Sequence, residues 1–176
     1  MQLKSATDRI DEVVDVIATA NGNLVGRTRL QKTVCLLTIS GLSEGFDFSY
    51  NHYGPFSQEL ASVTEIAGIF ANLTEVQNKT QWGGTYSVFS TTAASKTQAG
   101  SPRDLIIKIA NAADPIELEL AVTAVFLAKE GIQSAWEETA FRKPDKIGGG
   151  RLERAKDLYR RLLAIPTPLP LPKISS

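Results

Sequence analysis

Histidine and cysteine, the side chains that most often act as base and nucleophile near neutral pH, each occur once in the chain, as His52 and Cys35. Cys35 lies beside Leu36 and Leu37 in an apolar run, where a small buried thiol is the common outcome. We therefore expect no Cys–His pair, no catalytic residues and no enzyme. An enzyme that depends on His52 stays open as a third interpretation.

Metal and phosphate chemistry also lack their usual sequence patterns. The chain contains no His-Glu-x-x-His, no acidic metal-binding loop and no phosphate-binding loop. Gly148-Gly149-Gly150 is not followed by the Lys-Ser/Thr of a P-loop, and this run is interpreted as a flexible joint. A single cysteine permits no internal disulfide. We predict neither a metal nor a cofactor.

Aromatic side chains gather where a strand is expected to lead into a helix. Residues 46–50 alternate between apolar and polar, as in a half-buried strand. Gly54 and Pro55 are predicted to form a structural turn that ends it, and Ser57 can cap the helix that follows. The residues at this junction that suit a protein interface are Tyr50, His52, Tyr53 and Phe56. Packing of the same rings into the protein's own core remains an alternative.

Three cations, Arg27, Arg29 and Lys32, cluster in the first turn of the next predicted helix upstream, where the helix dipole disfavours positive charge. One interpretation is a solvated helix end. The other is a contact with an anion or an acidic partner, and on that interpretation the three cations join the partner-binding set.

The elements that must position these residues are mostly helical. Apolar periodicity and capping residues predict helices over 8–20, 28–40, 57–71, 101–111, 114–129, 134–141 and 152–163. Residues 73–77 and 85–91, which flank Gly83-Gly84, predict a β-hairpin. Helix, helix, strand, helix and hairpin is the order of a winged-helix domain.

We therefore predict an α+β, mostly helical protein with a winged-helix-like core and a β-hairpin wing. The core is assigned to residues 1–95, and a helical C-terminal cap packed on it to residues 101–163. Residues 164–176 form a Pro-rich tail, and alternating prolines predict that the chain from Ile165 onward stays outside the packed fold.

DNA binding is the natural suggestion of a winged helix, but the charge distribution speaks against it. The predicted third helix contains Glu59 and Glu65 and no Lys or Arg, whereas phosphate contacts depend on cations. The last helix carries five cations mixed with acidic residues: Arg151, Arg154, Lys156, Arg160 and Arg161. Whether they are functional or a solvated face stays open. A winged-helix DNA-binding transcription regulator is the alternative function.

No apolar run approaches the roughly 20 residues that span a bilayer, and the first residues lack the pattern of a signal peptide. These features predict a cytoplasmic protein without a membrane partner. The 19 basic and 19 acidic residues balance, so no overall field recruits a polyanion.

Three segments together resemble the YwgA-like proteins, which are akin to the Panacea (SocA-like) antitoxin domain. Residues 26–37 resemble their T-K-L-Q-K-L-V-Y-L-L helix, and residues 53–61 resemble their Y-G-P-Y-S-x-E-L signature, with Phe56 in place of the usual tyrosine. Residues 118–127, with Lys143-Pro144 downstream, resemble their later core helix. The resemblance implies a winged-helix-like core, a helical cap and regulatory or antitoxin-type protein binding, without established chemistry.

The sequence thus predicts a non-enzymatic regulatory or antitoxin-like module that acts on a protein partner, either a toxin or a regulatory protein. It leaves the oligomeric state open.

Overall fold

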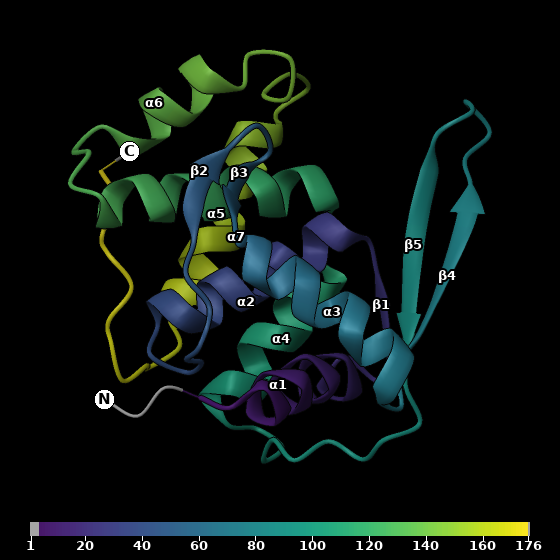
Figure 1. Cartoon of the computed structure of the whole chain (residues 1–176). Coiled ribbons are helices and arrows are strands. Elements are labelled where there is room, and N and C mark those ends of the chain that lie inside the picture. The colour runs from purple at the N-terminus through teal and green to yellow at the C-terminus, as the bar shows by residue number, and fades with distance from the viewer. Residues whose placement is uncertain (1–3, 176) are drawn as a thin grey trace.

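Helices dominate the computed structural model, which describes residues 4–175 (Figure 1). The first half contains α1 (Ala6–Thr19), β1 (Asn23–Val25), α2 (Arg27–Ile39), β2 (Ser49–Asn51), β3 (Gly54–Phe56), α3 (Gln58–Phe70), β4 (Thr74–Lys79) and β5 (Thr85–Ser90). The second half contains α4 (Pro102–Ala112), α5 (Pro115–Lys129), α6 (Ala135–Arg142) and α7 (Arg151–Leu163). The predicted α+β, mostly helical class with a β-hairpin is confirmed.

Local capping explains where α1, α4 and α5 begin. The Ser101 hydroxyl accepts a hydrogen bond from the Asp104 N–H at the start of α4, and the Asp114 carboxylate accepts two at the start of α5. The start of α1 differs from the expectation by two residues, because Ser5 forms a capping box with Asp8.

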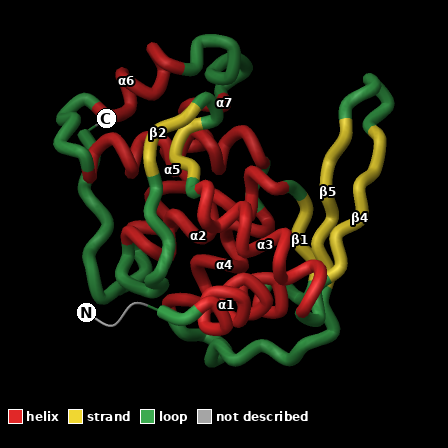
Figure 2. Tube along the Cα trace, viewed as in Figure 1, coloured by secondary structure: helices red, strands yellow, loops and turns green. Residues whose placement is uncertain are grey.

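The predicted hairpin forms and gains a third strand. The order in this sheet is β1-β5-β4, and all pairings are antiparallel (Figure 2). Leu24 of β1 and Glu75 of β4 lie on either side of Phe89 in β5. Strand β1 was not predicted from the sequence, because a three-residue strand is too short to show a periodicity.

The strand predicted over residues 46–50 is shorter than expected, and the residues before Ser49 form a loop. Only Ser49–Asn51 forms a strand, and it pairs with Gly54–Phe56 in a tight hairpin of its own. The turn therefore lies at His52 and Tyr53. Gly54 and Pro55 belong to β3, which corrects their assignment to the turn.

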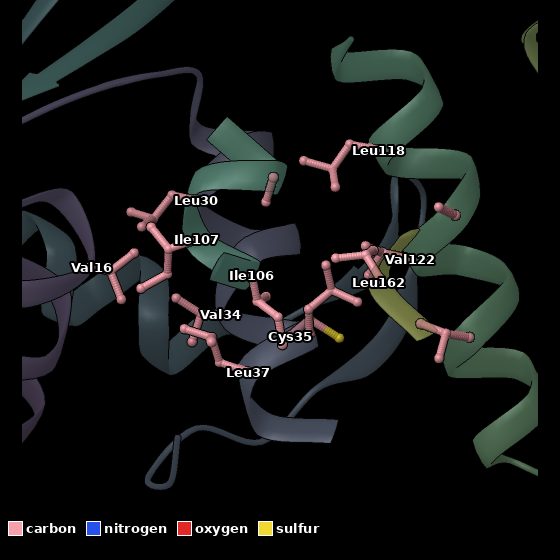
Figure 3. Packing of buried hydrophobic residues seen from close by; sticks show 14 of the residues in the cluster. Val16, Leu30, Val34, Cys35, Leu37, Ile106, Ile107, Leu118, Val122 and Leu162 are labelled. Atoms are coloured by element: carbon pink, nitrogen blue, oxygen red, sulfur yellow. The ribbon is translucent and has the colours of Figure 1, made fainter. Parts of the chain in front are cut away.

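Two helices form the centre of the core, because every residue of 29–37 in α2 and of 118–127 in α5 is buried. Figure 3 shows Val34 and Cys35 of α2 with Ile106 of α4, Val122 of α5 and Leu162 of α7 in one cluster. The helices expected to form a C-terminal cap therefore share one continuous core with α2.

The tail docks on the domain, contrary to the expectation for residues from Ile165 onward. Ile165 and Leu171 are buried, and the Leu169 N–H donates to the Ser40 carbonyl oxygen (3.0 Å). The Tyr159 hydroxyl donates to the Pro172 carbonyl oxygen at 2.5 Å. Prolines prevent regular secondary structure, but they leave the intervening leucines free to pack.

A membrane-spanning segment is not found among the helices of residues 4–175, since none combines the necessary length and apolarity.

We expect truncation after Ala164 to lower the melting temperature measured by circular dichroism, because it removes buried Leu171 and both tail hydrogen bonds. In the full chain, Leu171→Ala should reduce the free energy of unfolding by about 2 kcal/mol, the lower end for a buried leucine. Leu169→Ala is the matched control and should cost less, because this side chain is exposed. A truncated chain that melts like the full one would contradict the docking.

Candidate functional site

A cleft of 260 Å³ opens between α2, α3 and the two hairpins. Its largely apolar wall is formed by Leu30, Tyr53, Phe56, Ala61, Thr64 and Phe89. Charged side chains also line it, namely Arg27, Lys32, Glu65 and Glu75. The cleft therefore combines apolar depth with charge of both signs.

The structure brings four of the seven predicted partner-binding residues to this cleft: Arg27, Lys32, Tyr53 and Phe56. Tyr50, His52 and Arg29 do not line it. Ala61 and Thr64 of α3 and Phe89 of β5 also line the cleft but were not predicted, because α3 and β5 lie apart in the chain and these side chains carry no chemical signal of their own.

Arg29 is a structural residue, which rules out both interpretations offered for it. Its guanidinium is buried and donates to the carbonyl oxygens of Ala110 and Ala113, each at 2.7 Å. Carbonyl groups at a helix C-terminus lack partners within the helix, so Arg29 caps the end of α4. Burial lowers its pKa.

Lys32 is also buried, so the interpretation of a solvated helix end fails here too. The side chain is 1% exposed, and its ammonium group donates to the Pro55 carbonyl oxygen at 2.6 Å. Burial lowers the pKa of Lys32 from 10.5 to about 8. The lysine holds β3 against α2.

Gln31, the neighbour of Lys32, fixes the start of α3. Its amide nitrogen donates to the Ser57 carbonyl oxygen and its amide oxygen accepts from the Ser57 N–H, both at 2.9 Å. The Ser57 hydroxyl in turn accepts from the Leu60 N–H. One glutamine thus anchors the capping residue of α3 to α2 and sets one wall of the cleft.

A buried ion cluster supports the hairpin from the α5 side. Glu119 accepts hydrogen bonds from the ammonium groups of Lys143 (2.6 Å) and Lys146 (2.7 Å). Burial alone would raise the pKa of Glu119, but these hydrogen bonds outweigh it and hold the pKa below its ordinary value. Lys143, from the Lys-Pro pair noted in the sequence, is therefore an interior residue.

Glycine is required at position 54. Its φ angle is +82°, and an added Cβ would lie 2.6 Å from the Thr123 hydroxyl oxygen of α5. Both the backbone conformation and the close approach exclude a larger residue without strain. Position 54 therefore favours glycine within β3, although it does not lie in the turn where it was predicted.

The aromatic rings of the hairpin turn lie at the surface beside cations. Tyr53 is 59% exposed, and the Lys146 ammonium lies 5.3 Å from its ring centre. The Arg142 guanidinium lies 4.5 Å from the ring centre of Tyr50. The exposed His52 ring packs edge-on against Tyr53 at 4.9 Å. The turn therefore offers aromatic and cationic surface next to the cleft.

Cys35 and His52 occupy different environments. Cys35 is fully buried in the core, and this burial raises the pKa of its thiol to about 12. Such a thiol stays protonated near neutral pH and is a poor nucleophile. Within residues 4–175, no three His, Cys, Asp or Glu side chains gather as metal ligands would.

The solvent side of α3 combines apolar and acidic side chains. Ile66, Ile69 and Phe70 are exposed, together with Glu65.

Three of the five cations on α7 are engaged in ion pairs: Arg154 with Glu117, Lys156 with Glu153, and Arg160 with Asp157.

Comparison with known proteins does not identify a family for this chain. No family model matches the chain, and no curated protein matches it either. The resemblance to the YwgA-like and Panacea proteins rests on the three quoted segments.

Lys32→Met should change how stability depends on pH. Because the folded-state pKa lies near 8 and the unfolded value near 10.5, the unfolded chain binds the proton more tightly. Stability of the wild type should therefore rise relative to Lys32→Met by about 1–3 kcal/mol between pH 8 and 10.5. Urea unfolding of both proteins across this range measures the difference, and a constant difference would contradict the buried, protonated lysine.

Gly54→Ala should lower the free energy of unfolding, as measured by urea unfolding, for two separable reasons. One is the steric clash of the new Cβ with the Thr123 hydroxyl, and the other is the strain of a positive φ angle. Replacement of Thr123 by alanine in the same chain removes the clashing hydroxyl, and should recover the steric term only. The remaining loss should be about 1–2 kcal/mol, the cost of a left-handed backbone for a residue with a Cβ. Equal losses with and without Thr123→Ala would show that the hydroxyl does not restrict position 54.

Proposed function

We propose that this protein is a non-enzymatic regulatory or antitoxin-like module, and that it binds a protein partner by taking an apolar side chain of that partner into the α2–α3 cleft. The observation that carries this proposal is the cleft itself, an apolar hollow beside the exposed Tyr53 ring. Buried anchors of this kind, one side chain in one pocket, provide most of the binding energy at many interfaces.

The size of the cleft favours a side chain over a free small molecule. Sites for drug-sized ligands usually measure about 300–1,000 Å³, and this cleft measures 260 Å³. Its walls come from elements that are tied together by Lys32 and Gln31, so the hollow is formed before a partner arrives. A preformed pocket lowers the ordering cost of binding.

The surroundings of the cleft suit a protein surface. The Arg27 guanidinium and the Glu75 carboxylate form an ion pair at 2.8 Å, and Glu65 lies exposed nearby on α3. Apolar centres with a polar rim of both signs are typical of protein interfaces. A phosphate backbone would instead meet the carboxylates of α3. The proposal places the protein in the cytoplasm, where its lone cysteine would stay reduced.

A cleft-filling substitution tests the proposal. Peptides selected from a displayed random library on the wild-type protein should share an apolar or aromatic anchor residue. Ala61→Phe places a ring into the cleft, and should weaken the binding of these peptides by at least about tenfold, or about 1.4 kcal/mol, in fluorescence anisotropy. Ser62→Phe is the matched control, because it adds the same ring one position away on the exposed side of α3.

Two results would overturn the proposal. One is a selection that yields no binding peptide. The other is a set of peptides that bind Ala61→Phe and Ser62→Phe equally well, since binding would then take place elsewhere on the surface.

A further inference from the structure

The outer strand of the wing, β4, has one edge without a partner strand in residues 4–175. The sheet order is β1-β5-β4, so β4 pairs with β5 alone. Figure 1 shows the β4–β5 hairpin projecting away from the helices. Exposed strand edges present rows of unpaired backbone groups and are ready to pair with another chain.

The backbone groups that face outward can be identified from the hydrogen bonds of β5. The Ser87 carbonyl oxygen accepts from the Gly26 N–H (2.8 Å) beside β1, so the odd-numbered residues of β5 face β1. The Gly84 carbonyl oxygen accepts from the Thr80 N–H (2.7 Å), so the even-numbered residues face β4.

The register then assigns the two sides of β4. Val76 pairs with Val88, which places the even-numbered residues of β4 toward β5. The N–H and C=O groups of Glu75, Gln77 and Lys79 therefore point outward. Among residues 4–175, none of these groups has a hydrogen bond beyond the β4–β5 ladder.

We propose that β4 pairs antiparallel with β4 of a second copy of this chain, around a two-fold axis at Gln77. The outward-facing N–H and C=O groups of the two β4 strands then lie within reach of one another, and Gln77 lies opposite Gln77 of the second copy. Glu75, whose Oε1 atom also pairs with Arg27 of its own chain, lies opposite Lys79 of the second copy, and the reverse pair forms by symmetry. Opposite charges placed directly across a strand pair stabilise it.

Charge selects this register among those that the backbone permits. A two-fold axis at Val76 would place Glu75 opposite Gln77 and Lys79 opposite Leu73. An axis at Asn78 would place Lys79 opposite Gln77. Only the axis at Gln77 pairs a carboxylate with an ammonium, and it does so twice.

The same register accounts for the most exposed apolar residues near the wing. Trp82 at the hairpin tip is 93% exposed, while Ile69 and Phe70 at the end of α3 are 73% and 81% exposed. With the axis at Gln77, position 82 of one copy comes level with position 72 of the other, immediately beyond α3. Pairing therefore brings the tryptophan to the end of the helix that carries the two exposed apolar side chains.

Oligomeric state is the first test. The full chain should form a dimer in light scattering coupled to size exclusion, with a population that rises with concentration. Lys79→Glu places two carboxylates opposite each other and should raise the dimer dissociation constant at least about tenfold. Lys173→Glu makes the same charge change in the tail and should leave it unchanged. A wild-type chain that stays monomeric at every concentration overturns the proposal.

Crosslinking is the second test and reads the register. Directly opposed hydrogen-bonded residues have Cα atoms about 5.5 Å apart, within the range that a disulfide spans. Gln77→Cys should therefore form a disulfide dimer in a glutathione redox buffer, whereas Val76→Cys, opposite Asn78 of the second copy, should not. Cys35 is buried and should not compete. Preferential crosslinking of Val76→Cys, or none by either variant, would reject the register.

Discussion

The packing of the β2–β3 hairpin and of α3 depends on two adjacent polar side chains buried in α2. Lys32 binds the Pro55 carbonyl oxygen and Gln31 binds both backbone groups of Ser57, so one turn of helix holds the strand and the cap of the next helix. Buried polar groups without partners are costly. The hairpin and α3 are therefore held in one position relative to α2, and the same hydrogen bonds hold the walls of the cleft between them.

Positive charge is concentrated behind this hairpin. Lys32 and Lys143 are both buried, and Glu119 is a buried carboxylate within the same region. Repulsion from Lys143 and Lys146 and attraction from Glu119 both act on Lys32, while its burial has the largest effect on its pKa. Such an arrangement persists because the ammonium groups find carbonyl or carboxylate acceptors, and it explains why Lys143 lies in the interior while the neighbouring Pro144 is exposed.

Sequence patterns predicted the elements well where the signal is local. Asp114 before Pro115 and Ser101 before Pro102 defined α5 and α4, since capping acts within one turn. They failed at Leu171, whose burial depends on a surface formed by residues far away in the chain. For the candidate site, Tyr53 and Phe56 were predicted from their aromatic character, whereas Ala61 and Phe89 line the cleft only because α3 and β5 meet there.

The sequence by itself determined the helical class and the β4–β5 hairpin, because turn residues and apolar periodicity are encoded within a few residues. Only the tertiary structure decided what the cations of α2 do. Arg27 stays at the surface in an ion pair, while Arg29 and Lys32 turn inward to backbone carbonyl groups. Helical spacing does not distinguish these outcomes. The Ala110 and Ala113 carbonyl oxygens that accept from Arg29 lie at the end of α4, about eighty residues further along the chain, and only folding brings them within hydrogen-bond distance.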